Sequence, residues 1–387
     1  MPRDLTHIIL ADDIGEKLPV ETAKNLSLNK TAYHMGAISH DSFLYGPSPK
    51  LSTKMHGGLG DDTRKIVLTL LDGVRRETDP EMRNIQKAFT FGFLSHMATD
   101  TAFHPFVYSV SGSQVRENNP SDEHVRLAKA RHRYTETWLD MHFVEKKGYN
   151  FDNFRPMRKI VCDVKNRKKL SGFFCEAYQR AYDVDDNVSK GYEKGMLLQL
   201  FLGKMTRNQS LARMMRRLDM LMGDRLATET SGFYQKDRKI PEQLTQFSSY
   251  THPVTGEKVH KTLDDLTKDA VERGVALISA AEKYISNGNR KEFLHAVPNT
   301  NLDTGIPDTR LSDIKRAVPV PLSSLKGTKR DAFGRRGGLK VMPSGADVEG
   351  TSSAKTAHPV LLKYFKRFEK TAEAALTAFK QKTGLGR

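Results

Sequence analysis

The chain has few cysteines and no long apolar run. Its 387 residues include only two cysteines, Cys162 and Cys175, which excludes a disulfide scaffold and a cysteine-rich zinc module. Any metal site must therefore be built from nitrogen and oxygen ligands. No segment approaches the roughly 18 uninterrupted apolar residues of a spanning helix, which excludes an integral membrane protein. Because no apolar stretch follows a basic start, we expect no secretory signal and a cytoplasmic or peripheral membrane location.

Acidic residues are too few to balance the basic ones, and the imbalance is uneven. The formal net charge is +16, from 62 Lys and Arg against 46 Asp and Glu. Residues 310–387 alone hold 17 basic and 6 acidic residues, which leaves +5 for the first 309. A basic surplus attracts phosphate, in nucleic acid or on an anionic lipid surface. Because it lies mainly in the tail, we expect it to serve docking rather than chemistry.

Alternating strand patterns are scarce, and helical patterns dominate. Apolar spacing and caps predict helices over residues 64–74, 80 to about 97 or beyond, 121–145, 158–183, 189–203, 208–223 and 262–286. Pro105 disfavours helical geometry at the preceding residue, so we expect a helix end at His104 that turns this ring inward. The fold class that follows is mainly α.

The composition divides the chain into three parts. Residues 1–300 carry the helical patterns, and residues 301–357 are rich in proline, glycine and basic residues, which is typical of a linker or lid. Residues 358–387 combine an apolar stripe at helical spacing with basic side chains. This predicted C-terminal helix either packs on the body or lies on a membrane surface.

Histidines crowd the first third of the sequence, where nine of the thirteen lie within residues 1–142. His96, Asp100 and His104 are spaced at i, i+4 and i+8, which places them on one face of a helix. His96 and His104 would lie about 12 Å apart along the axis, too far to share one ion through bonds of about 2 Å. These three side chains, which we call the ladder, therefore predict a multinuclear site in which Asp100 bridges two ions or lies centrally.

A second pair, His132 and Glu136, is spaced at i and i+4, as in a chelating pair for zinc. With His104 it would give one ion three ligands and an open position. Such pairs on exposed helices are often only solvated ion pairs. The coincidence with two further candidates in loop-like stretches, Asp41 and His56, favours metal binding.

These motifs together resemble the zinc-dependent phospholipase C family, whose fold is shared with the S1/P1 nucleases and the N-terminal domain of glycosylphosphatidylinositol-specific phospholipase D. Residues 91–104 resemble its Phe/Leu-x-Gly-x-x-x-His-Met-x-x-Asp-x-x-x-His segment, and residues 33–41 its Gly-x-x-x-Pro-Asp turn, with His40 where proline is usual. Residues 5–7, 53–56 and 132–136 resemble its Ser/Thr-His element, isolated histidine and closing His-x3-Glu. The resemblance covers residues 1–142 and implies a multi-helix bundle with a multinuclear metal site between helices.

The resemblance also implies a ligand set for two to three Zn²⁺ ions. One ion would be held by His56, His96 and Asp100, a second by His104, His132 and Glu136, and a third by His7 with bridging Asp100, while Asp41 would be the catalytic carboxylate that orients and deprotonates water. In secreted members the N-terminal residue also binds the third ion. Here Met1-Pro2 stands in that region, so we expect a third site that is empty, has two ligands or is completed by another group.

The function implied is that of a metal-dependent phosphodiester hydrolase, a phospholipase C that cleaves phospholipid head groups through zinc-activated water. Its partners would be a phospholipid substrate and, through the basic tail, an anionic membrane surface. One alternative is a single-strand nuclease or 3′-nucleotidase, which would bind nucleic acid and stack bases on Phe43, Tyr45, Phe106 or Tyr108. Another is a non-catalytic metal- or membrane-binding protein. Head-group preference and oligomeric state stay open.

Overall fold

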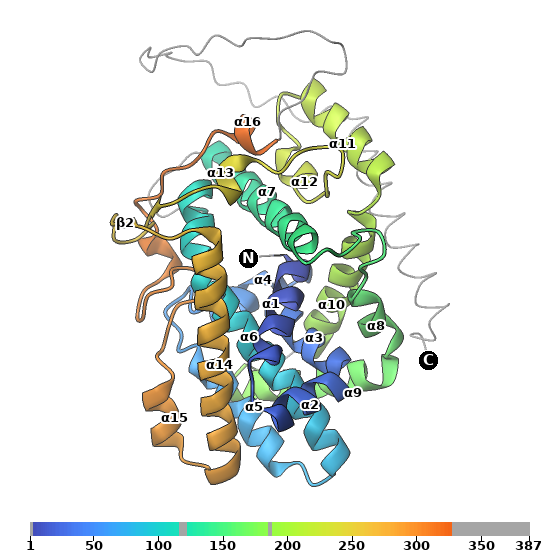
Figure 1. Cartoon of the computed structure of the whole chain (residues 1–387), viewed down its shortest axis with the longest axis vertical. Coiled ribbons are helices and arrows are strands. Elements are labelled where there is room, and N and C mark those ends of the chain that lie inside the picture. Colours follow the sequence, from blue (N-terminus) through green and yellow to red (C-terminus); the bar gives the residue numbers. More distant parts are fainter. Residues whose placement is uncertain (1–2, 116–121, 185–187, 327–387) are drawn as a thin grey trace. The chain divides into compact units, whose positions relative to one another are not determined.

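The computed structural model describes residues 3–115, 122–184 and 188–326, which are mainly helical (Figure 1). The helices are α1 (Asp4–Glu16), α2 (Val20–Leu28), α3 (Lys30–Ser39), η1 (Ser42–Tyr45), α4 (Pro49–Met55), α5 (Arg64–Arg76), α6 (Pro80–Ser111), α7 (Asp122–Lys146), α8 (Met157–Cys162), α9 (Val164–Tyr182), α10 (Val188–Met205), α11 (Gln209–Leu221), α12 (Ala227–Thr230), α13 (Glu242–Thr245), α14 (Leu263–Asn287), α15 (Arg290–Ala296), η3 (Leu311–Asp313) and α16 (Leu322–Leu325). Strands β1 (Tyr250–Thr251) and β2 (Lys258–Val259) form a short antiparallel pair. The expectation of a mainly α fold is confirmed.

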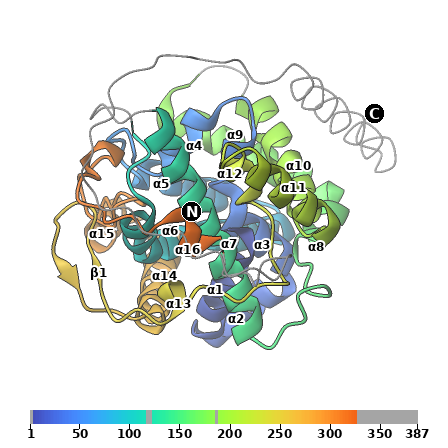
Figure 2. The ribbon, with the colours of Figure 1, turned by 90° about the horizontal axis from the view of Figure 1, so that it is seen from above.

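Helix α6 is the central element of the bundle. Every residue from Ala88 to Ser111 is buried, and the helix contacts α1, α3, α5, α7 and α14. Viewed from above, α6 and α7 lie inside an outline formed by α14, α15 and α8 to α11 (Figure 2). A helix that is buried on all sides belongs to the core, so polar side chains in its last turns need partners or a function.

Two glycines allow α3 and α6 to approach each other closely. A Cβ added to Gly36 would lie 1.9 Å from the carbonyl oxygen of Phe89, and one added to Gly92 would lie 1.9 Å from that of Tyr33. Real Cβ atoms do not tolerate such distances. The contact brings the C-terminal end of α3, which leads into Asp41, against the turn of α6 that carries His96.

Most of the predicted helices occur, and their ends follow from side-chain caps. Asn208 accepts hydrogen bonds from the first turn of α11, and Thr262 forms a capping box at the start of α14. The single helix predicted over 158–183 is wrong, because the structure has α8 and α9 there. The side chain of Asp163 accepts from the N–H of Asn166 and so begins a new helix.

The predicted end of the helix at Pro105 is also wrong, because α6 continues to Ser111 with Pro105 inside it. An interior proline costs about 3 kcal/mol through one missing hydrogen bond and a steric clash. Burial of the whole segment outweighs that cost here. The helix ends instead at Gly112, whose φ of 91° suits glycine. The His104 ring therefore stays on the ladder instead of turning at a helix end.

Residues 301–326 lie against the helices of the body. The N–H of Leu302 donates to the carbonyl oxygen of His56 over 2.9 Å, and the indole of Trp138 donates to the carbonyl oxygen of Leu325 over 2.7 Å. Residues 327–387, with most of the predicted linker and the whole predicted C-terminal helix, lie outside the described residues. The three-part division of the chain stays a prediction.

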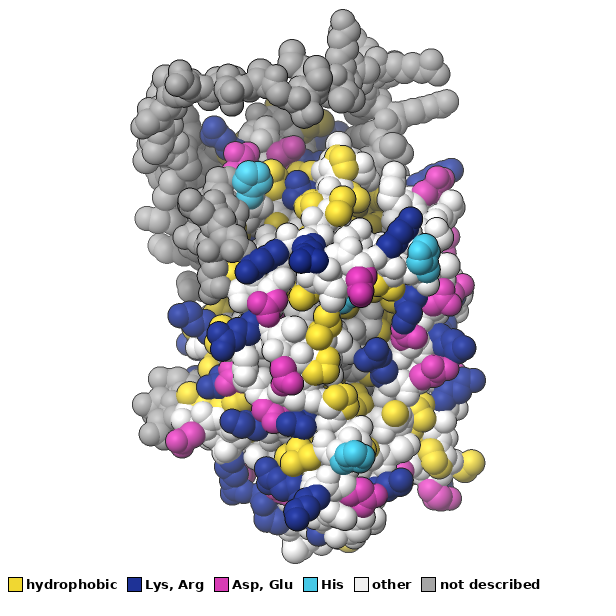
Figure 3. Space-filling model, turned by 90° about the vertical axis from the view of Figure 1, so that its left-hand side faces the viewer, with side chains coloured by type: hydrophobic (Ala, Val, Ile, Leu, Met, Phe, Trp, Pro, Cys, Tyr) yellow, Lys and Arg dark blue, Asp and Glu magenta, His cyan; other side chains and the backbone are white. Residues whose placement is uncertain are grey.

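The surface drawn in Figure 3 carries Lys and Arg side chains interspersed with Asp and Glu, and no patch of a single sign dominates that face. None of the helices in the described ranges is long and apolar enough to cross a bilayer.

The close contact between α3 and α6 yields the first prediction. Gly92→Ala should lower the free energy of unfolding by about 3 kcal/mol or more, because the new methyl group meets backbone that cannot move aside. Gly172→Ala is the matched control, since Gly172 lies in α9 with nothing within 4 Å of an added Cβ. It should be neutral or stabilise by up to about 1 kcal/mol. Urea unfolding measures both, and equal midpoints would contradict the close-packing argument.

Candidate metal centre

The predicted ligands come from five separate parts of the chain and converge in one buried site. His7 lies on α1, Asp41 follows α3, and His56 ends α4. The ladder lies on α6 and the His–Glu pair on α7. Ligand atoms lie within 4.8 Å of one another in three groups, which are His7, His96 and Asp100; Asp41, His56 and His96; and His104, His132 and Glu136. The structure thus brings all eight predicted site residues together.

Asp100 lies at the centre of these groups and is fully buried. Its Oδ2 lies 2.9 Å from Nε2 of His96 and 3.3 Å from Nε2 of His56. Its Oδ1 lies 3.3 Å from Nε2 of His7 and 3.5 Å from Nε2 of His104. Each oxygen therefore faces a different pair of imidazoles, which is the arrangement of a bridging carboxylate.

Backbone carbonyls fix the orientation of three of the imidazoles. Nδ1 of His56 contacts the carbonyl oxygen of Ser52 at 2.7 Å, Nδ1 of His96 that of Ala37 at 2.8 Å, and Nδ1 of His104 that of Leu302 at 2.9 Å. An imidazole that donates through Nδ1 keeps a lone pair on Nε2. In all three cases Nε2 points toward Asp100, where it can bind a metal ion whenever it carries no proton.

The polar atoms that face the centre of the site have no hydrogen bonds. These atoms are Nε2 of His7, His56, His96 and His104 and both carboxylate oxygens of Asp100, and all are buried. A buried polar group without a hydrogen bond costs about 1 to 3 kcal/mol. A cation would satisfy these atoms together, so the residues fit the zinc ions that the resemblance implies.

The rings of His7, His96, His40 and Phe93 form one stack. Their successive centroids lie 3.8, 4.4 and 3.6 Å apart, with interplanar angles of 10°, 6° and 23°. His40, which the sequence left ambiguous, lies inside this stack and in none of the three ligand groups. Its contacts support the His96 ring from the side opposite His7.

Burial and neighbouring charges set the protonation of the site. Burial lowers the pKa of His7 to about 3, so this imidazole is neutral and ready to act as a ligand. Burial also lowers the pKa of His56, but the carboxylates of Asp100, Asp303 and Asp41 outweigh it and raise the value to about 9. Burial raises the pKa of Asp41 to about 6. At neutral pH the metal-free site therefore holds a proton on His56.

Several residues that support the site were not predicted from the sequence. Asp140 caps α1 from α7, because its Oδ1 accepts from both the N–H and the hydroxyl of Thr6 over 2.7 Å. Asp140 lies four residues after Glu136. Continuing the i, i+4 spacing of His132 and Glu136 by one more step would therefore have predicted it. Tyr108 lies four residues after His104 and so continues the ladder of His96, Asp100 and His104. Asp303 had no such signal, because it lies far along the chain in the predicted linker.

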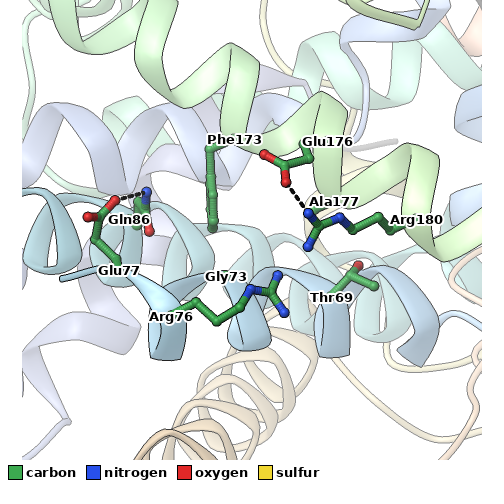
Figure 4. A pocket seen from close by; sticks show the side chains of 9 residues that line it. All are labelled: Thr69, Gly73, Arg76, Glu77, Gln86, Phe173, Glu176, Ala177 and Arg180. Atoms are coloured by element: carbon green, nitrogen blue, oxygen red, sulfur yellow. Dashed lines mark hydrogen bonds and ion pairs between the residues drawn. The ribbon is translucent and has the colours of Figure 1, made fainter.

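A hollow elsewhere on the surface is lined by residues of α5, α6 and α9 (Figure 4). Its charged groups are paired in part, since Arg180 contacts Glu176 and Gln86 contacts Glu77. None of the predicted ligands lines it. The buried histidine site is therefore the candidate functional site.

The raised pKa of His56 yields the second prediction. Adding zinc to the metal-free protein at pH 7 should release about one proton or more per chain, because Nε2 must lose its proton to bind the ion. In the metal-free protein, protonated His56 adds to the free energy of unfolding. This contribution is fully present below the ordinary pKa of 6.5 and is lost as the pH rises through about 9. Calorimetry in buffers of different ionisation enthalpy measures the released protons. Binding without proton release at pH 7 would contradict this protonation state.

Comparison with known proteins agrees with the geometry. No curated protein and no solved structure matches the chain. Residues 6–184 match the family model of zinc dependent phospholipase C. This segment is slightly less than half of the chain, and it contains α1 to α9 apart from the first residues of α1, with every predicted ligand. Over residues 6–184, the chain is therefore similar to the zinc-dependent phospholipase C family.

Proposed function

We propose that this protein is a phosphodiester hydrolase that cleaves phospholipid head groups as a phospholipase C. The observation that carries the proposal is the convergence of four imidazoles on the two oxygens of buried Asp100, within the segment that matches this family. A cluster that leaves so many buried polar atoms without hydrogen bonds is too costly for a purely structural core.

The distances support the assignment of each ion. His56 and His96 would hold one ion with Oδ2 of Asp100, and His7 would share a second with Oδ1. The third would lie between His104, His132 and Glu136. Bound zinc supplies a Lewis acid that lowers the pKa of water and offsets the charge of a phosphodiester. This chain's own part is to hold the ligands in fixed tautomers in a dry site.

The exposure of the ligands indicates the side from which substrate enters. The side chains of His7, His96, Asp100 and His104 are 0% exposed, so they form the floor. The side chains of Asp41, His132 and Glu136 are also buried but are slightly more exposed, at 7%, 9% and 8%, so we place the entry on their side of the site. A phosphate group would therefore meet these three side chains first, and water held beside it would lie next to Asp41.

Asp41 is the proposed general base. Its Oδ1 lies 3.7 Å from Nε2 of His56 and 3.8 Å from Nε2 of His96, outside direct hydrogen bonding but close to the two imidazoles that would hold the first ion. With a pKa of about 6, the carboxylate is mostly ionised at neutral pH and can accept a proton from water.

The structure gives less support to the nuclease alternative. Phe43 and Phe106, two of the four candidate stacking side chains, are fully buried in separate hydrophobic clusters. Tyr108 packs edge-on against His132 inside the site. A surface that stacks bases needs exposed rings, and among these four only Tyr45 is partly exposed. Membrane contact through the basic tail and a cytoplasmic or peripheral location stay predictions.

The third prediction tests the function directly. Asp41→Asn in the zinc-loaded protein should lower head-group release from phosphatidylcholine vesicles about 10²- to 10⁴-fold, because the base is lost. Asp264→Asn is the matched control, since the Asp264 side chain is 77% exposed and lies outside the site. It should leave the rate unchanged. Parallel assays use single-stranded oligonucleotides.

Two other outcomes of these assays would contradict the proposal. Release of nucleotides without release of head groups would replace the phospholipase proposal with the nuclease. Failure to cleave either substrate, with full metal content, would indicate a protein that binds metal without catalysis.

A further inference from the structure

We propose that Asp303 is a positioning residue for the ion held by His104, His132 and Glu136, acting through the His104 ring. This inference rests on the proposed metal cluster. Asp303 lies outside residues 6–184, the segment that matches the family. It belongs to residues 301–309, which we name the strap loop.

The strap loop ties together two parts of the chain that carry ligands. Asn301 donates to the carbonyl oxygen of Gly57 over 2.9 Å, and Leu302 donates to that of His56 over 2.9 Å. On the other side, Gly305 lies against α6, where an added Cβ would be 2.9 Å from the carbonyl oxygen of Thr101. The strap loop therefore connects the end of α4 to the His104 turn of α6.

Within the strap loop, the backbone directs Asp303 into the site. The side-chain oxygen of Asn301 accepts from the N–H groups of Asp303 and Thr304 over 2.8 and 3.1 Å, which forms a tight turn. The Asp303 carboxylate is buried and its Oδ1 lies 3.4 Å from Nδ1 of His104. The neighbouring carbonyl of Leu302 accepts from the same Nδ1 over 2.9 Å. One short segment thus supplies both the carbonyl that accepts from the His104 ring and a carboxylate close to the same nitrogen.

Tyr108 links this carboxylate to the second histidine of the same ion. Its hydroxyl donates to Oδ1 of Asp303 over 3.3 Å. Its ring packs edge-on against His104 and His132, with centroids 5.7 and 4.7 Å away. Asp303 and Tyr108 together therefore restrain both imidazoles of this ion.

Charge balance explains why a carboxylate is useful there. Two or three divalent ions would carry more positive charge than Asp41, Asp100 and Glu136 can offset. A carboxylate behind a metal-bound imidazole fixes the ring, raises its basicity and adds negative charge next to the cation. Loss of such a group typically lowers metal affinity 10- to 100-fold.

The fourth prediction compares Asp303→Asn with Asp308→Asn in the full-length chain. Asp308 lies on the same loop, is exposed, and has a φ of 56° that asparagine adopts readily. Zinc affinity is measured by competition with a chromophoric chelator, and the visible spectrum of the Co²⁺-loaded protein reports the ligand field. Thermal unfolding of the metal-free protein reports any structural loss.

For Asp303→Asn we expect a loss of about 10- to 100-fold in the affinity for one ion, with a changed Co²⁺ spectrum. Metal-free stability should equal that of Asp308→Asn. Unchanged affinities, or equal losses at every ion with a lower melting temperature, would overturn the proposal. Because these readouts need no substrate, a selective loss in a protein without hydrolase activity would support Asp303 and overturn only the proposed function.

Discussion

A buried carboxylate surrounded by imidazoles is the interaction on which the rest of the structure depends. Asp100 is fully buried and faces four imidazole nitrogens, and neither it nor those nitrogens have hydrogen bonds. Such a pocket is costly in a dry core unless cations fill it. The surrounding fold must therefore hold these groups close together despite the free-energy cost of burying them.

Three features of the fold supply this support. The glycine pair Gly36 and Gly92 lets α3 and α6 touch, which places Asp41 beside His96. Asp140 caps α1 and so anchors the helix that carries His7. The strap loop joins the end of α4 to α6. Each feature connects ligands that are distant in sequence, so the site is a property of the whole bundle and not of one motif.

The sequence predicted those parts of the site that depend on local spacing. His96, Asp100 and His104 were found because helical periodicity alone places them on one face, and most helices were found through their caps. The effect of Pro105 was predicted wrongly, because burial of α6 outweighs a local preference. Asp303 could not be predicted, because its contact with His104 joins residues nearly 200 positions apart. Only tertiary packing creates that contact.

The metal content of the purified protein tests the central claim most directly. Elemental analysis after dialysis against metal-free buffer should find two to three equivalents of zinc per chain, because three groups of potential ligands lie in one buried site and two of them share His96. His96→Ala should lower that number, since His96 belongs to two of the groups. A content of one equivalent or none in the wild-type protein would contradict the cluster.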